Sequence, residues 1–265
     1  MRKTVTSTIV AAAVAAGAFA GVAIADSFVG TGAADQMRGT NRPDQLYGED
    51  GNDTIAALSS NDYLEGGPGD DMLDGGPGDD LMIGGTGDDS VTGGGGIDVA
   101  YAGAGNDSIL GEDGNDVLFG QAGDDRVFGG AGDDRLYTGA GSDFASGGGG
   151  DDWVSGDSAD PSEVTMLNGS PGNDKIAATG PGRFHAGGGT GNDRIVTSRG
   201  RDTVVGGPGE DHIATRAGND TIDVADGERD VVRCGSGRDK VKADKLDRLI
   251  GCERKQRVAV HSSHR

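Results

Sequence analysis

Aliphatic residues recur at every ninth position along the first half of the chain, and the positions between them are mostly polar or glycine. Each aliphatic residue is the centre of a three-residue segment that suits one short β-strand with a single inward side chain. The six residues before each segment are rich in glycine, which tolerates positive φ and is typical of turns. The pattern therefore predicts short strands joined by turns. The aliphatic positions are Met37, Leu46, Ile55, Leu64, Leu73, Met82, Val91, Ala100, Ile109, Leu118, Val127, Leu136, Ala145 and Val154.

An aspartate stands two residues before every one of these aliphatic positions, and a glycine precedes most of the aspartates by two residues. The three positions stay in register over fourteen units, which indicates an internal repeat. Its unit is G-G-x-G-x-D-x-U-x, where U is aliphatic. The aspartates are Asp35, Asp44, Asp53, Asp62, Asp71, Asp80, Asp89, Asp98, Asp107, Asp116, Asp125, Asp134, Asp143 and Asp152.

Two such units make one coil of 18 residues, with the order strand, turn, strand, turn. Coils of this kind stack by parallel strand pairing with a rise of about 4.8 Å, so the regular units predict a rod roughly 30 Å long. Each coil then contacts only its neighbours. The sequence thus predicts an all-β fold, a parallel β-roll (right-handed β-solenoid) of stacked 18-residue coils.

Eight units carry the whole G-G-x-G-x-D core, and blocks such as Gly66-Gly67-Pro68-Gly69-Asp70-Asp71 repeat it without a departure. In these motifs the chain resembles the hemolysin-type (RTX) family of calcium-binding repeat proteins over about residues 26–252. The eight units begin at Gly66, Gly75, Gly84, Gly93, Gly129, Gly147, Gly188 and Gly206. A nucleotide-binding loop is excluded, because no Gly-Lys-Ser/Thr follows the glycines.

Composition makes a cation necessary. The chain has 53 glycines among 265 residues, 44 acidic against 23 basic residues, and only 4% aromatic residues. One buried aliphatic side chain per nine residues, worth roughly 1.5–3 kcal/mol, does not offset a backbone entropy cost of about 1–2 kcal/mol per residue. Hard oxygen ligands in flexible geometry favour Ca²⁺; Mg²⁺ requires a stricter octahedron, and transition metals prefer His or Cys.

The resemblance implies that calcium lies in the turns, held by glycine carbonyls and by aspartates that bridge adjacent turns. On the matching positions of this chain it implies carboxylate ligands from the repeat aspartates and carbonyl ligands from the repeat glycines. The implied residues are Gly66, Gly69, Asp71, Gly75, Gly78, Asp80, Gly84, Gly87, Asp89, Gly93, Asp98, Asp107, Asp116, Asp125, Gly129, Asp134, Asp143, Gly147, Asp152, Asp193 and Asp211.

The acids directly before the repeat aspartates leave two alternatives open. They are either further ligands, or contributors through their carbonyls alone with solvated side chains. They are Asp70, Asp79, Asp88, Asp124, Asp133 and Asp151.

Residues 1–25 have the features of a signal peptide: Arg2 and Lys3, a small and apolar run, and Ala23-Ile24-Ala25 as an A-x-A cleavage pattern. A membrane anchor is the rival interpretation. We expect cleavage after Ala25 and a secreted, extracellular chain. Residues 26–165 carry a net charge of −26, which disfavours nucleic acid and anionic membranes as partners. At the other end, residues 254–265 are predicted to be a basic flexible tail, for which contact with an anionic envelope polymer or polysaccharide is the sharper hypothesis.

The period breaks after the regular units of 26–155. Residues 156–168 are predicted to bulge out as a loop, and residues 169–253 to be degenerate repeats. There Arg183 and Arg248 fall in aspartate positions, and Thr197 and Thr215 are among the residues that replace turn glycines. The sequence predicts weaker or absent calcium along part of this second segment, with arginines substituting for ionic charge.

Cys234 and Cys252 lie 18 residues apart, which is one coil. They would occupy the same position on adjacent coils, within the usual Cα separation of a disulfide. Two cysteines in an exported chain also favour pairing. We therefore expect a disulfide that clamps the last coil.

No catalytic motif is present, since H-E-x-x-H and G-x-S-x-G are absent and the four histidines do not cluster. The sequence predicts a secreted, monomeric, non-enzymatic calcium-binding protein that folds into a β-roll on binding Ca²⁺. The alternatives are an extracellular adhesion or matrix protein that uses the calcium-rigidified rod as a binding surface, and an enzyme with an unrecognised site.

Overall fold

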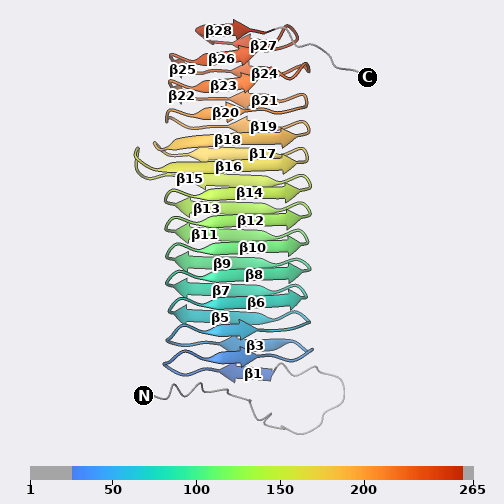
Figure 1. Cartoon of the computed structure of the whole chain (residues 1–265), viewed down its shortest axis with the longest axis vertical. Helices are drawn as coiled ribbons and strands as arrows, with labels where there is room; N and C mark the ends of the chain where they lie inside the picture. The colour runs from blue at the N-terminus through green and yellow to red at the C-terminus, as the bar shows by residue number, and fades with distance from the viewer. Residues whose placement is uncertain (1–25, 259–265) are drawn as a thin grey trace, which may run out of the picture.

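A computed structural model describes residues 26–258, and it shows an elongated stack of short strands (Figure 1). Two parallel sheets of thirteen strands each, here called sheet I and sheet II, run the length of the stack, and a two-stranded sheet lies beside them. Among the described residues no helix is long and apolar enough to cross a bilayer.

Sheet I contains, in spatial order, β1 (Asp26–Val29), β3 (Asp44–Tyr47), β5 (Tyr63–Pro68), β7 (Leu81–Thr86), β9 (Val99–Ala104), β11 (Val117–Ala122), β13 (Arg135–Ala140), β15 (Trp153–Asp157), β17 (Lys175–Thr179), β19 (Arg194–Val196), β21 (His212–Ala214), β24 (Val231–Arg233) and β27 (Arg248–Ile250). Sheet II contains β2 (Gln36–Arg38), β4 (Thr54–Ala56), β6 (Met72–Pro77), β8 (Ser90–Gly95), β10 (Ser108–Asp113), β12 (Arg126–Ala131), β14 (Phe144–Gly149), β16 (Val164–Pro171), β18 (Arg183–Thr190), β20 (Thr203–Val205), β23 (Thr221–Val224), β26 (Lys240–Ala243) and β28 (Arg254–Arg257). The small sheet pairs β22 (Ala217–Gly218) with β25 (Ser236–Gly237).

Apart from β22 and β25, consecutive strands alternate between the two sheets, so each strand pairs in parallel with the strand one coil later. In the regular region the pairing has a register of 18 residues, as in Leu64 with Met82 in sheet I and Leu73 with Val91 in sheet II. This register confirms the predicted stack of 18-residue coils in a parallel, all-β fold.

The strands of the regular region are longer than the sequence predicts. From β5 to β14 each strand has six residues, because parallel pairing continues past the aliphatic centre into the first glycines, as in Gly67 with Gly85. Only three residues, such as 69–71 between β5 and β6, are then left for each turn. The expected three-residue strand and six-residue turn are therefore wrong in length.

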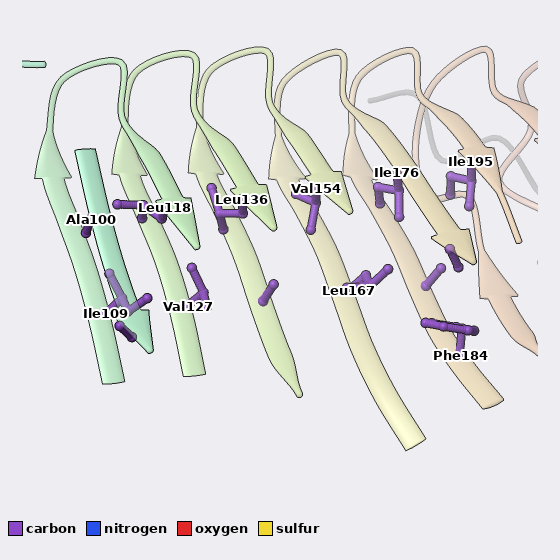
Figure 2. Packing of buried hydrophobic residues seen from close by; sticks show 14 of the residues in the cluster. Ala100, Ile109, Leu118, Val127, Leu136, Val154, Leu167, Ile176, Phe184 and Ile195 are labelled. Carbon is purple, nitrogen blue, oxygen red and sulfur yellow. The ribbon is translucent and has the colours of Figure 1, made fainter. Parts of the chain in front are cut away.

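The core is a single column of aliphatic side chains between the sheets. Figure 2 shows part of it, where side chains such as Leu118, Val127 and Leu136 from successive strands point into the narrow space between the sheets. The repeat position U is fully buried in almost every coil, as predicted. A second inward position follows two residues later and is filled by glycine or a small residue in most coils.

The break in the period is confined to a shorter stretch than the sequence predicts. Residues 158–163 lie outside the strands, whereas Val164–Pro171 forms β16, and Leu167 enters the core. The predicted loop over 156–168 is thus wrong at both ends, because strand pairing resumes on either side of a segment that adds only four residues to the coil. Across this loop the register is 22, as in Val154 with Ile176.

The C-terminal end is more ordered than expected. Arg254–Arg257 forms β28 and pairs with β26, so the prediction of a flexible tail from residue 254 is wrong for these four residues. The Cys234–Cys252 disulfide is present with a Cα separation of 5.1 Å, as predicted. The predicted signal peptide, 1–25, and residues 259–265 of the tail lie outside the described residues.

Candidate functional site

The repeat aspartates form two columns, one along each edge of the stack where the chain turns from one sheet to the other. The aspartates of these columns are here called ladder aspartates, and each position in a column is called a rung. The first edge leads from sheet I into sheet II, and the second edge leads from sheet II into sheet I. On the first edge the column contains Asp35, Asp53, Asp71, Asp89, Asp107, Asp125, Asp143, Asp202, Asp220 and Asp239. On the second edge it contains Asp44, Asp62, Asp80, Asp98, Asp116, Asp134, Asp152, Asp174, Asp193, Asp211, Asp230 and Asp247.

One carboxylate oxygen of each ladder aspartate from Asp53 onward has a structural task. The backbone N–H of Asp80 donates to Oδ1 of Asp98 over 2.8 Å, and the N–H of Asp116 donates to Oδ1 of Asp134 over the same distance. The bond recurs coil after coil, so each aspartate fixes the turn one coil before its own. A charge-assisted bond of this kind explains why the side chain is acidic and short.

The other oxygen, Oδ2, is buried without a hydrogen-bond partner at nearly every rung of both columns within residues 26–258. The exceptions among the regular units are at the N-terminal end, where Thr31 and Thr40 donate to Oδ2 of Asp35 and Asp44. A buried carboxylate oxygen without a partner is costly, and a whole column of them requires compensation. The aspartates with a free Oδ2 include all of those implied as ligands from the sequence: Asp71, Asp80, Asp89, Asp98, Asp107, Asp116, Asp125, Asp134, Asp143, Asp152, Asp193 and Asp211.

Glycine opposite most of the free oxygens leaves space beside them. The inward residue five positions before the aspartate, here called the cradle residue, is glycine in most regular units. At Gly75 an added Cβ would overlap Oδ2 of Asp80, so any side chain would occupy the space that the oxygen faces. The same holds for the predicted glycines Gly66, Gly84, Gly93, Gly129 and Gly147.

Backbone carbonyls complete the oxygen-rich surroundings. Gly69, Gly78 and Gly87 all have positive φ, and the carbonyl of the residue one coil earlier lies where their Cβ would be, as Gly51 O does at Gly69. The chain therefore needs glycine here, because the coils approach so closely that carbonyl oxygens stack along the edge.

Burial raises the pKa values of the ladder aspartates from Asp53 onward. It raises the pKa of Asp80 to about 7, with a further contribution from the charges of Asp98 and Asp62, although the Asp62 N–H lowers it. Asp125 and Asp211 have a pKa of about 7 for the same main reason, loss of hydration. Without a cation these columns hold their charge at an energetic penalty.

The donor set fits calcium. Carboxylate and carbonyl oxygens are hard ligands without a fixed geometry, which suits a large divalent ion such as Ca²⁺. Within the described part of the chain, no three His, Cys, Asp or Glu side chains are grouped to hold a metal by themselves. The carboxylates are spread along the edges instead, so backbone carbonyls would have to supply the remaining ligands.

The acids that precede the ladder have exposed side chains. Oδ1 of Asp79 accepts from the N–H of Ile97, and Oδ1 of Asp133 accepts from the N–H of Asp151. Each therefore bonds the backbone of the next coil from outside the turn. Of the two alternatives for Asp70, Asp79, Asp88, Asp124, Asp133 and Asp151, this placement favours surface side chains over ligand carboxylates.

Two aspartate positions in the second half were misplaced by counting in nines. The N–H of Phe184, not of Arg183, donates to Oδ1 of Asp202. Near the end, Asp247 occupies the rung that the sequence assigned to Arg248, since its Oδ1 accepts from the N–H of Asp230. Coils of 19 and 17 residues shifted the frame by one residue. The D-x-U signature would have located Asp247, as it locates Asp230 and Asp239, but not the Phe184 rung, which carries no aspartate.

The comparisons with known proteins can be set beside this geometry. The model of the RTX calcium-binding nonapeptide repeat matches residues 29–64, 57–91, 92–127, 128–160 and 187–222. A search of curated proteins gives no significant match.

A solved structure, the X-ray crystal structure of a hyperactive, Ca²⁺-dependent, beta-helical antifreeze protein from an Antarctic bacterium, aligns with 89% of this chain and 81% of its own. Its sequence identity is 20% and its TM-score is 0.42, values too low to bear on the function of this chain. The family matches, in contrast, span more than half of the residues and coincide with the aspartate columns. The chain belongs to the RTX calcium-binding nonapeptide repeat family.

Proposed function

We propose that this protein is an exported, non-enzymatic calcium-binding rod that is largely unfolded without Ca²⁺ and folds when the ion enters its turns. The observation that carries the proposal is the column of buried aspartate oxygens, nearly all without a partner and most of them facing a glycine. A divalent cation between these oxygens would remove the penalty of burying them.

The balance of energies supports folding that depends on the ion. The core offers one aliphatic side chain per nine residues, and the charge of residues 26–165 is −26. Binding of an ion to the folded chain but not to the unfolded chain adds its binding free energy to stability. Since the ligands of each site come from neighbouring turns, ion binding and coil stacking would occur together.

The test is circular dichroism during a calcium titration of the full chain, starting in excess chelator. The expected result is a low β-signal in chelator and a sigmoidal gain of β-structure with calcium. A matched titration with Mg²⁺ should produce little β-structure, because Mg²⁺ requires a stricter octahedral geometry than Ca²⁺ and gives up its water less readily. A chain that is already rich in β-structure in chelator would refute folding by calcium.

Export rests on the N-terminal sequence alone. The A-x-A pattern before Asp26 supports cleavage there and an extracellular location, where calcium is abundant enough for sites of about 10⁻⁴–10⁻³ M. Sequencing the N-terminus of the protein from the culture medium should give Asp26. An intact Met1 in the membrane fraction would contradict this part of the proposal.

A second candidate function, adhesion through a rod face, is favoured by one specific observation. All four tyrosines and the tryptophan of the chain lie on sheet I, with side chains on its outer side. Tyr101, Phe119 and Tyr137 stack face to face with centroid separations of 4.7 and 4.9 Å. Such a row of half-buried rings offers a flat binding surface.

Co-sedimentation of the calcium-loaded rod with insoluble cell-envelope polysaccharide tests this second function. Binding should fall when Tyr101 and Tyr137 are replaced by alanine. The control is Met72→Ala and Met166→Ala on sheet II, which should leave binding unchanged.

A further inference from the structure

The two edges of the rod differ in what fills their cradles. On the second edge the cradle residue is glycine in every coil from Gly75 to Gly206. These glycines are Gly75, Gly93, Gly111, Gly129, Gly147, Gly169, Gly188 and Gly206, and an added Cβ at each would overlap Oδ2 of the ladder aspartate. The open column therefore continues unbroken as far as Asp211, well into the segment that the sequence describes as degenerate, and ends there, because the cradle position of Asp230 holds no glycine.

On the first edge the glycine cradles end early. Gly66, Gly84 and Gly120 are open in the same way, with the methyl of Ala102 between them, and Gly120 is the last open cradle before an aspartate. Beyond it the corresponding positions hold Thr138, Gly156, Ala178, Thr197, Thr215 and Cys234. Between Asp125 and Asp211, the loss of open cradles thus belongs to the first edge alone.

Threonine hydroxyls stand beside the carboxylates on this edge. Thr138 and Thr197 are completely buried, five residues before Asp143 and Asp202 respectively. Neither hydroxyl is aligned in a regular hydrogen bond. A rotatable O–H at this position can compensate part of the charge that an ion would neutralise elsewhere.

Between these threonines the ladder itself is replaced by uncharged residues. The hydroxyl of Thr165 stands at the next rung, 3.5 Å from the N–H of Asp143, and donates to the Gly141 carbonyl over 3.1 Å. The rung after it holds Phe184, which is fully buried. Together with Leu167, the Phe184 ring fills the space over Gly156, with carbon atoms 3.1 Å from where a Cβ would lie.

Positive side chains gather on the outside of this same edge. From the Phe184 rung onward, most first-edge turns carry an exposed arginine directly before the rung, whereas the second-edge turns from Asp174 to Asp211 carry a neutral or acidic residue there; beyond them, Arg229 precedes Asp230. The arginines are Arg183, Arg201 and Arg238, and the second-edge residues are Asn173, Asn192 and Glu210. An arginine at a turn repels a divalent cation, and a neutral or acidic residue does not. Charge and packing therefore agree on which edge lacks the ion.

We propose that calcium occupies the second edge as a continuous row as far as Asp211, whereas on the first edge beyond Asp125 the chain's own threonine, phenylalanine and cysteine side chains take the place of the ion. This inference rests on the proposed calcium-binding function and changes its distribution. The second segment is not poor in calcium as a whole; one of its edges is.

Anomalous scattering from crystals of the full chain grown in calcium tests the proposal directly. The expected result is a row of anomalous peaks along the second edge up to Asp211, and no first-edge peak beyond Asp125. Peaks on both edges of the second half would overturn the inference, and so would their absence from both edges there. A folded rod without any peak would instead refute calcium binding itself.

Paired variants give a second readout in solution, the number of calcium ions bound per chain at saturation. Asp193→Asn, on the second edge, should lose about one ion, whereas Asp202→Asn, on the first edge of the same region, should lose none. Thr138→Gly should open a cradle and gain about one ion. Circular dichroism in calcium confirms that each variant is folded. Equal losses from the two aspartate variants would contradict the proposal.

Discussion

At the scale of the residue, the ladder aspartate has two separate tasks for its two oxygens. Oδ1 accepts from the backbone of the preceding coil, and Oδ2 stays free beside the cradle. Glutamate has an additional methylene and would not reach both positions from the same Cα. The excess of aspartate over glutamate is thus a matter of side-chain length.

Replacing Asp116 with asparagine tests this division. The amide side chain would keep an acceptor for the Asp98 N–H but remove the charge, so we expect a folded rod that binds about one ion fewer and has lower calcium affinity. Asp113→Asn, three residues away on the exposed surface, should leave calcium binding unchanged. Isothermal titration calorimetry measures both quantities, and equal effects from the two variants would contradict the assignment.

The raised pKa values give a pH dependence for the metal-free chain. The pKa of Asp80 rises from 3.8 to about 7 on folding, so between these values the folded chain binds more protons than the unfolded chain. Its free energy of unfolding therefore falls as the pH rises through this window, and the stability present in acid is lost near neutrality.

Urea unfolding in chelator, followed by circular dichroism, should accordingly show more residual structure at about pH 4.5 than at about pH 7.5. With calcium present, the dependence of stability on pH should have the opposite sign, because protons compete with the ion for the same oxygens. The apparent calcium affinity should therefore increase with pH. Metal-free chains that are equally unfolded at both pH values would show that the aspartates do not control folding.

The residue-scale assignments also show what could be predicted from the sequence. The fixed spacing located every rung from Asp35 to Asp152, because each coil there has the same length. It failed at Phe184 and Asp247, where turns absorb or lose single residues while the Asp-to-backbone bond keeps the rungs aligned. The inward cradle position was also missed, since a threonine there looks like ordinary repeat decay until its burial beside a carboxylate is known.

At the scale of the element, each strand contributes one large side chain to the core and depends on its neighbours for the rest. Leu118 of β11 is fully buried between coils that supply Ala100 and Leu136 to the same sheet. A column of this kind has no second layer that can move in to fill a cavity. Because the core is so thin, each aliphatic side chain in it makes a large contribution to stability.

We therefore expect Leu118→Ala to lower the free energy of unfolding of the calcium-loaded rod by about 2–5 kcal/mol. Leu110→Ala on β10, whose side chain points outward and is 37% exposed, should cost under about 1 kcal/mol. Denaturant unfolding in saturating calcium measures both changes. A comparable loss for the two variants would show that the column is not the principal apolar core.

At the scale of the whole molecule, charge is distributed along the rod axis. The N-terminal half is strongly acidic, whereas residues 229–265 carry a net charge of +6. Without calcium, like charges in each column repel along the axis, and this repulsion acts over about 10 Å at 0.1 M salt. Dimensions of the metal-free chain should therefore depend on ionic strength.

Small-angle scattering in chelator should give a radius of gyration that decreases between about 20 mM and about 500 mM NaCl. The calcium-loaded rod should show nearly no change over the same range, because its charges are neutralised locally. A metal-free chain that is insensitive to salt would indicate that the backbone entropy of glycine, and not charge, keeps it unfolded.

Alternation of the strands between two sheets has a consequence for how such a chain changes in length. Removal of residues 90–107, one full coil, returns every later residue to its original sheet and edge. Removal of residues 90–98 alone would transfer every later unit to the opposite sheet and edge. Thr197 and the Phe184 rung would then lie on the second edge, in the same column as the open glycine cradles that precede the deletion. The sequence repeat is nine residues long, but one coil consists of two such repeats. Insertions or deletions therefore preserve the sheet and edge of every later residue only when they add or remove an even number of repeats.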